Sequence, residues 1–157
     1  MSPTITPISD FYKIILLEKY KLLYTEWLRA VSSEEYRAAL LEAYKCIRLH
    51  QLELWVMDST RNNPTVQDQK WSVEKLGSLM AGTLIRKVAM VRADDLFVEV
   101  VAEVMRDKIY KLYGQERQLE HFRTLEEALQ YVLPGEDPAK LVIELQNAEA
   151  YTGYPAD

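Results

Sequence analysis

The chain has 157 residues, of which 48% are hydrophobic and 27% charged, a size and composition typical of one soluble globular domain. These figures exclude a disordered chain and a collagen-like repeat, and the apolar run Ile14–Leu17 is far shorter than the ~20 residues that cross a bilayer. The net charge of −5 is uneven, because residues 124–157 hold one basic side chain and seven acidic ones. Since basic side chains do not cluster, we expect neither nucleic acid nor an anionic membrane as a partner.

The chain has a single cysteine, Cys46, which cannot form an internal disulfide and therefore fits a reducing compartment. No basic segment precedes the first apolar run, so we expect no secretory signal peptide. Both observations predict a cytoplasmic protein.

The first predicted elements are a β-hairpin and a helix. Two apolar stretches, residues 11–17 and 21–28, are separated by the polar step Glu18-Lys19, and this pattern predicts two strands joined by a short turn. Ser32 and Glu35 then have the spacing of a capping box, which begins a helix. Apolar residues at three- and four-residue steps predict its buried face: Tyr36, Ala39, Leu40, Ala43, Tyr44 and Ile47.

A strand, a helix and a second strand are predicted next. Residues 52–58 and 85–91 are nearly continuous apolar runs, typical of strands buried on both faces in a parallel sheet. Between them, a helix is predicted from about Thr65 to Ala81, entered through Asn63-Pro64 and closed by Gly82. Two parallel strands joined in this way require a right-handed crossover.

The rest of the chain predicts three more helices and one strand. Asp94 or Asp95 caps a helix whose apolar face runs from Phe97 to Leu112, with Gly114 after it. A strand at 117–122 is followed by a second capping-box pattern at 124–127 and by a short helix from Asp137-Pro138. The order predicts an α/β fold, with a mostly parallel sheet of about five strands, an N-terminal β-hairpin and about four covering helices.

Four segments of this pattern carry a resemblance to a known superfamily. They are the helix start Ser32–Glu35, the strand end Trp55–Asn62, the helical Gln69–Trp71 and the closing segment Phe122–Leu129. Together with the hairpin, they resemble the SpoIIAA-like, or STAS-like, domain superfamily. The resemblance spans about residues 11–133, which makes residues 1–10 an N-terminal arm and residues 134–157 an acidic C-terminal extension.

The resemblance implies a non-enzymatic protein-interaction domain with a regulatory role. STAS-type antagonists of anti-sigma factors carry a phosphorylatable serine in an Asp-Ser-small-Gly turn, where a phosphate changes the affinity for a partner. This chain has Asp58-Ser59 followed by Thr60-Arg61. Since the turn lacks the glycine, the phosphoserine role does not carry over to Ser59 or Thr60. The wider superfamily also resembles lipid-carrier folds, so the alternative is a carrier or sensor of a small apolar ligand.

No catalytic or metal-binding motif is visible in the sequence. Glycine-rich phosphate loops, the G-x-S-x-G elbow and the H-E-x-x-H zinc motif are all missing. Cys46, His50 and His121 are too scattered for a zinc site, and Cys46 has the sequence surroundings of an inert thiol. We therefore expect no enzymatic activity, no metal and no cofactor.

The most polar candidate site follows the third predicted strand. Asp58, Ser59, Thr60, Arg61 and Asn62 come in sequence there, and ligands of open α/β sheets bind outside the carboxyl ends of strands. These residues predict a polar binding site in which Asp58 and Arg61 hold each other. The other interpretation is an ordinary loop whose side chains satisfy backbone groups.

Trp71 is the candidate for an interface. At about 100° per residue, Val66, Val73, Leu76 and Met80 share one face of the predicted helix, and Trp71 lies on the opposite, solvent-facing side. A tryptophan in that position predicts an anchor for self-association, with a homodimer first, or for a protein partner. Two alternatives remain: the acidic C-terminal segment covers Trp71, or the helix phase is shifted by one residue.

Overall fold

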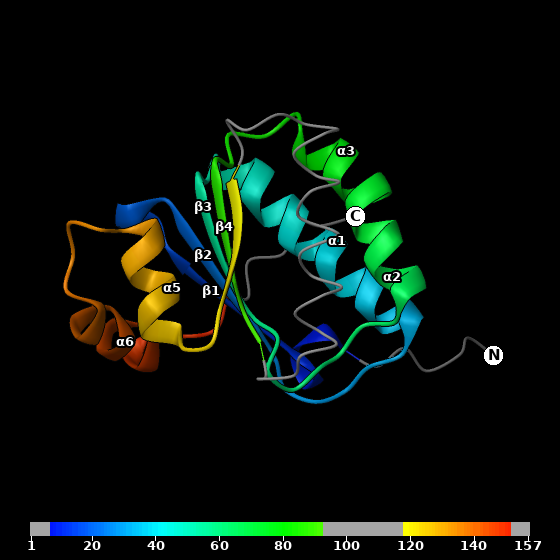
Figure 1. Cartoon of the computed structure of the whole chain (residues 1–157), viewed down its shortest axis with the longest axis horizontal. Helices are drawn as coiled ribbons and strands as arrows, with labels where there is room; N and C mark the ends of the chain where they lie inside the picture. The colour runs from blue at the N-terminus through cyan, green and yellow to red at the C-terminus, as the bar shows by residue number, and fades with distance from the viewer. Residues whose placement is uncertain (1–6, 93–117, 152–157) are drawn as a thin grey trace.

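The protein has three layers, with helices on both faces of a five-stranded sheet. The computed structural model describes residues 7–92 and 118–151 (Figure 1). The strand order is β1-β2-β3-β4-β5, and only the first pair is antiparallel. Helices α1, α2 and α3 cover one face, and α5 and α6 cover the other (Figure 1). The predicted α/β fold class is therefore confirmed.

The predicted hairpin is formed by β1 (Tyr12–Leu17) and β2 (Leu22–Trp27). A short 3-10 turn (Glu18–Tyr20) joins the strands, and Lys21 closes it in the left-handed region with a φ of 56°. The backbone N–H of Lys21 donates to the carbonyl of Glu18. A further 3-10 turn (Ile8–Asp10) precedes β1.

Helix α1 (Ser33–His50) begins with the predicted capping box. The Ser32 hydroxyl accepts from the Glu35 N–H at 3.2 Å, and the Glu35 carboxylate accepts from the Ser32 N–H at 3.0 Å. Two N–H groups that a helix start leaves unpaired are thereby satisfied. The helix ends at Gln51, whose φ of 53° is left-handed.

Strands β3 (Leu54–Asp58), β4 (Lys87–Val91) and β5 (Gln118–Phe122) continue the sheet parallel to β2. Central β3 is buried on both faces, as its continuous apolar run predicts. Because side chains alternate along a strand, Trp55 and Met57 belong to the core under α1, and Leu54 and Val56 belong to the core under α5.

The predicted helix between β3 and β4 is present but changes its winding midway. It consists of α2 (Val66–Trp71), the π-helical turn η3 (Ser72–Leu76) and α3 (Gly77–Met80). The Thr65 hydroxyl caps the start by accepting from the Asp68 N–H. Val73 and Leu76 are buried as predicted, whereas Val66 is 51% exposed and lies outside the apolar face.

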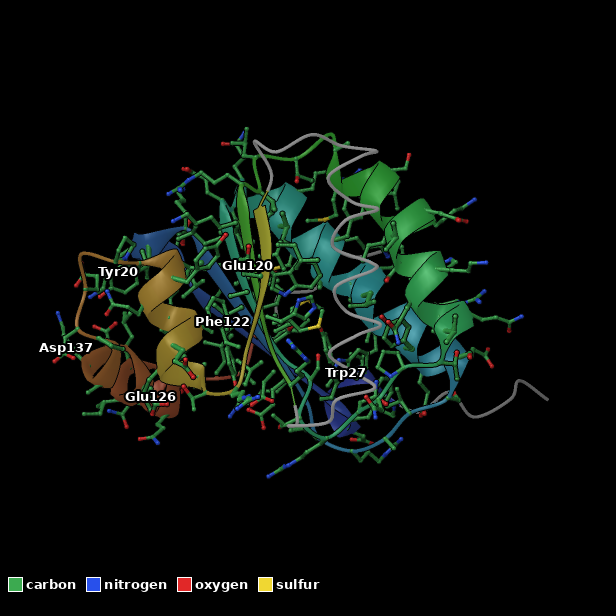
Figure 2. All side chains as sticks on the ribbon, viewed as in Figure 1. Tyr20, Trp27, Glu120, Phe122, Glu126 and Asp137 are labelled. Carbon is green, nitrogen blue, oxygen red and sulfur yellow. The ribbon has the colours of Figure 1, made fainter. Side chains whose placement is uncertain are left out.

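Helices α5 (Leu125–Val132) and α6 (Pro138–Asn147) form the opposite layer. Thr124 caps α5 and Asp137 caps α6, both as predicted. Side chains fill the space between this layer and the sheet (Figure 2). Leu141 and Leu145 of α6 join the same core as strand residues such as Ile15, so the acidic segment after residue 133 supplies part of the packed fold.

The end of the described chain returns to the first strand. The Tyr151 N–H donates to the carbonyl of Ile14 at 2.6 Å, which protects part of the β1 edge. The helix predicted at 97–112 lies outside the described residues. Among the helices of the described ranges, none is long and apolar enough to span a membrane.

Candidate functional site

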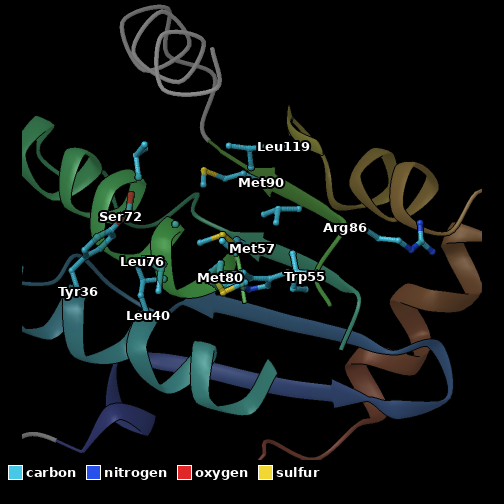
Figure 3. A pocket seen from close by; sticks show the side chains of 15 residues that line it. Tyr36, Leu40, Trp55, Met57, Ser72, Leu76, Met80, Arg86, Met90 and Leu119 are labelled. Atoms are coloured by element: carbon cyan, nitrogen blue, oxygen red, sulfur yellow. The ribbon is translucent and has the colours of Figure 1, made fainter. Parts of the chain in front are cut away.

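An apolar pocket lies between the α1–α3 layer and the sheet (Figure 3). Its volume is about 140 Å³. Side chains from α1, from η3 and α3, and from strands β3, β4 and β5 line it, among them Leu40, Leu76, Trp55, Met57, Met90 and Leu119. The described part of the pocket is therefore built where these six elements meet, and nearly every described side chain that lines it is apolar.

The strand register explains the floor of this pocket. Trp55 pairs with Val88, and Met57 pairs with Met90. Side chains directly opposite each other on parallel strands share a face, so these four form one patch. Methionine is flexible and polarisable and adapts to differently shaped neighbours, so Met57 and Met90 give the floor an adaptable surface.

The π-helical turn η3 supplies the opposite wall. Val73 and Leu76 of η3, together with Met80 of α3, line the pocket. A π turn holds one extra residue and rotates the helix phase, and such turns occur frequently at functional sites. Here it brings both buried residues of the turn toward the core.

One end of the pocket is polar. Tyr36 of α1 and Ser72 of η3 lie together there (Figure 3). Burial raises the pKa of Tyr36 to about 12, against the opposing effect of a hydrogen bond with Ser72. The Ser72 hydroxyl donates to the carbonyl of Gln69 at 2.8 Å. At neutral pH this corner therefore carries two uncharged hydroxyl groups.

The charged member of the described lining is Arg86, at the rim. Its side chain points away from the apolar group (Figure 3), and its Nε lies 3.2 Å from the Glu53 carboxylate. Both side chains are about half exposed. The charge of Arg86 is thus balanced by Glu53 at the solvent-exposed rim. The described apolar lining of the pocket favours an uncharged molecule over a charged one.

The predicted polar site at residues 58–62 is a loop tied to its own backbone. The Asp58 carboxylate accepts from the Thr60 N–H at 3.0 Å and from the Thr60 hydroxyl at 2.7 Å. The expected pairing of Asp58 with Arg61 is wrong: the salt bridges of the described residues do not include it, and Arg61 is exposed.

Ser59 and Asn62 of this loop are buried. The Ser59 N–H donates to the carbonyl of Val91 at 2.7 Å, and the Asn62 side-chain oxygen accepts from the Val31 N–H at 3.2 Å. These bonds join the loop to β4 and to the segment before α1. The carboxyl ends of β3 and β4 lie side by side, because the two strands pair in parallel with Asp58 opposite Val91. That residues 58–62 bind a ligand stays a prediction.

A carboxylate pair lies beside this loop. Glu26 and Asp58 are register partners at the ends of β2 and β3. The Tyr24 hydroxyl donates to Glu26 at 2.7 Å. Burial, followed by the neighbouring Glu26 and Asp58 carboxylates, raises the pKa of Tyr24. The Tyr24 phenol therefore stays a hydrogen-bond donor that holds Glu26 in place.

Trp71 does not lie on the solvent side of its helix, contrary to the prediction. It is half-buried, with its ring centroid 6.5 Å from that of Tyr36 in an edge-on arrangement and with the Arg37 guanidinium 5.4 Å from its centroid. Buried Asp68, three residues earlier, accepts from the Ser33 hydroxyl at 2.8 Å. The hydrogen bond between Ser33 and Asp68 therefore determines which face of α2 turns toward α1. The spacing of apolar residues in the sequence does not contain this information.

The remaining titratable candidates from the sequence, Cys46 and His50, have surroundings typical of residues with a structural role. Cys46 is buried, and burial raises its pKa to about 11, which disfavours the reactive thiolate. His50 Nε2 lies 3.1 Å from the Tyr151 hydroxyl. Within residues 7–92 and 118–151, no three His, Cys, Asp or Glu side chains form a group able to hold a metal ion.

The sequence reasoning missed the pocket, although a pattern pointed to it. Positions 55, 57, 88 and 90 alternate along two predicted neighbouring strands and hold a tryptophan, a valine and two methionines. Large, flexible side chains on one face of adjacent strands are a pattern that could have suggested it. In comparisons with protein-family models, curated proteins and solved structures, nothing matches this chain.

Proposed function

We propose that the protein is a carrier or sensor of a small apolar ligand, which binds between the α1–α3 layer and the sheet. The observation that carries this proposal is the pocket itself, with its apolar lining and its polar end. Pockets for small molecules are typically apolar, with a few placed polar groups that orient the ligand.

The volume limits the size of the ligand. An engineered apolar cavity of about 150 Å³ in another protein stays dry and binds benzene, and the pocket here has about 140 Å³. A single ring with one or two substituents fits this volume. A long acyl chain exceeds it.

We further propose that the role is binding rather than catalysis. Among the described lining residues, only Tyr36 and Arg86 are titratable, and they lie at different parts of the pocket (Figure 3). A paired nucleophile and base, which covalent acyl transfer requires, is not part of the described lining. A cytoplasmic location, supported by the single buried cysteine, belongs to the same proposal.

A STAS-like interaction domain, acting in regulation through a partner or a homodimer, is the second candidate. It is supported by Trp71 and Arg37, which form a half-exposed cation–π pair where α1 meets α2. Tryptophan and arginine are the residue types most enriched at interface hot spots.

Light scattering tests the homodimer form of this second candidate. The wild type is expected to be dimeric at micromolar concentration, and Arg37→Ala, which removes the partner of Trp71 without opening the core, is expected to shift it toward monomer. Arg61→Ala, an exposed position, is the matched control. A monomeric wild type would rule out this form.

Thermal unfolding with toluene tests the ligand proposal. At ten times the dissociation constant, a ligand that binds the folded state is expected to raise the Tm by roughly 3–6 °C. Val88→Phe adds a ring to the pocket floor and is expected to abolish the shift. Leu84→Phe adds the same ring at an exposed position outside the lining and is expected to keep it.

Two outcomes would contradict the proposal. One is a wild type whose Tm does not respond to toluene up to its solubility limit. The other is a response that Val88→Phe retains while circular dichroism shows that the variant is folded, because the ligand would then bind elsewhere.

A further inference from the structure

We propose that a shallow groove beside α5 docks an arginine side chain of a partner protein. The groove lies on the opposite side of the sheet from the apolar pocket, so the proposal is independent of the ligand-binding function. Phe122 and Glu126 lie on this side of the sheet (Figure 2). The end of β5, α5 and the start of α6 supply the described lining, which consists of Phe122, Glu126, Glu127, Gln130, Tyr131 and Pro138.

The spacing of residues along α5 brings four of these side chains together. Glu127 and Tyr131 are four residues apart, as are Glu126 and Gln130, and side chains at this spacing are neighbours on a helix surface. The opposite side of α5 is buried against the sheet through Ala128, Leu129 and Val132. The groove therefore lies on the side of α5 that the core leaves available to a partner.

Phe122 and Tyr131 form the aromatic part of the groove. Their ring centroids lie 5.3 Å apart with planes 44° apart, and both residues are half-buried. Aromatic rings attract cations, and Tyr131 already shows such a contact within the chain, because the Lys87 Nζ lies 4.9 Å from its ring centroid. Lys87 is not part of the described lining. The groove thus contains aromatic surface that suits a cation.

Glu126 and Glu127 give the groove its negative charge. The Thr124 hydroxyl donates to the Glu127 carboxylate at 3.0 Å and fixes its position. Within the described parts of the chain, the Glu126 carboxylate has no hydrogen-bond or ion-pair partner. Residues 124–151 as a whole hold six acidic side chains and one basic. This layer therefore complements the charge of a basic partner.

Rings and carboxylates in one groove fit arginine better than lysine. A guanidinium is planar, stacks on aromatic rings and donates two parallel N–H bonds to a carboxylate, whereas an ammonium is a strongly hydrated point charge. Tyr131 and Phe122 supply the rings, and Glu126 supplies an available carboxylate. Arginine and tyrosine are also enriched at interface hot spots. The partner that this groove fits is a protein with an exposed arginine.

Fluorescence anisotropy with labelled hexa-arginine and hexa-lysine peptides tests the proposal, at low ionic strength because salt screens exposed charges. The two peptides carry the same charge. Stacking of the guanidinium is expected to make hexa-arginine bind roughly two- to five-fold more tightly. Tyr131→Leu removes one ring and is expected to bring the ratio of dissociation constants toward one, with circular dichroism showing that the variant is folded.

Glu126→Gln and Glu149→Gln locate the binding site. Each removes one negative charge at an exposed position, but only Glu126 belongs to the described lining. Glu126→Gln is expected to weaken hexa-arginine binding roughly two- to five-fold, and Glu149→Gln, the matched control, is expected to leave it unchanged. Equal weakening by the two substitutions would overturn the proposal, because it indicates general attraction between opposite charges. Equal affinity of the two peptides for the wild type, or a preference for hexa-arginine that folded Tyr131→Leu fully retains, would overturn it as well.

Discussion

Trp55 on β3 has two roles. Its ring lines the pocket floor, and its indole N–H forms a hydrogen bond to the neighbouring strand β2. The residue is 3% exposed, and its indole nitrogen donates to the buried Thr25 hydroxyl on β2. Trp55→Ala leaves a cavity and an unpaired hydroxyl, so we expect a loss of about 3–5 kcal/mol in the free energy of unfolding. Urea titration measures it, and a loss below about 1 kcal/mol would contradict the central position of β3.

Asn62 and Arg61 are neighbours with opposite roles in the loop after β3. Asn62 is buried and accepts from the Val31 N–H, whereas Arg61 is exposed. We expect Asn62→Ala to lower the free energy of unfolding by about 1–3 kcal/mol and Arg61→Ala to change it by less than about 0.5 kcal/mol. Equal effects of the two substitutions in urea titration would mean that the loop is not held by Asn62.

The start of α1 makes the stability of the protein depend on pH. Arg29 donates to Glu35 at 2.9 Å, and this hydrogen bond, followed by that from the Ser32 N–H, lowers the pKa of Glu35 from 4.5 to about 2. A carboxylate whose pKa is lowered by folding stabilises the fold above its unfolded pKa and loses that effect as pH falls. The contribution of Glu35 is therefore complete above about pH 4.5 and disappears toward pH 2.

Glu35→Gln separates this contribution from those of other acids. Between pH 4.5 and 2, the wild type is expected to lose more stability in urea titration than the variant does. Glu34→Gln, at the neighbouring position and outside the capping box, is expected to follow the wild type. A constant difference between wild type and Glu35→Gln over this range would contradict the assignment.

At the scale of elements, the helix caps and the hairpin were predictable from the sequence, whereas the π-helical turn and the orientation of Trp71 were not. The Ser32–Glu35 capping box, the Asp137 cap and the hairpin depend on neighbours in the chain, so the sequence contains what is needed. The orientation of Trp71 depends on the Ser33–Asp68 hydrogen bond between two helices, and the π turn that follows shifts the helix phase. Periodicity counted at 100° per residue cannot include either effect.

At the scale of the whole molecule, α6 completes the second core. Leu141 is fully buried against it, whereas Ile143 on the same helix is 56% exposed. Leu141→Ala is expected to lower the free energy of unfolding by about 2–5 kcal/mol, and Ile143→Ala by less than about 0.5 kcal/mol. Similar effects of the two substitutions in urea titration would mean that α6 does not pack on the sheet.

The fold class was predictable from element order, whereas the pocket was not. Alternating apolar runs and helix starts define the sheet and its layers. The pocket depends on which strands become neighbours, on the register that sets Met57 beside Met90, and on the hydroxyl pair of Tyr36 and Ser72 from two helices. These relations arise from tertiary packing, so the sequence could suggest the face shared by residues 55, 57, 88 and 90 but not the pocket that the helices close over it.

The methionine methyl groups give the most direct test of the central claim, that a small apolar ligand binds in this pocket. Met57, Met80 and Met90 line it, and ¹³C-methyl NMR during a toluene titration reports on each, with resonances assigned by single Met→Leu variants. The account predicts saturable shifts of these three resonances with one common dissociation constant. Three unperturbed resonances up to the solubility limit of toluene would contradict it.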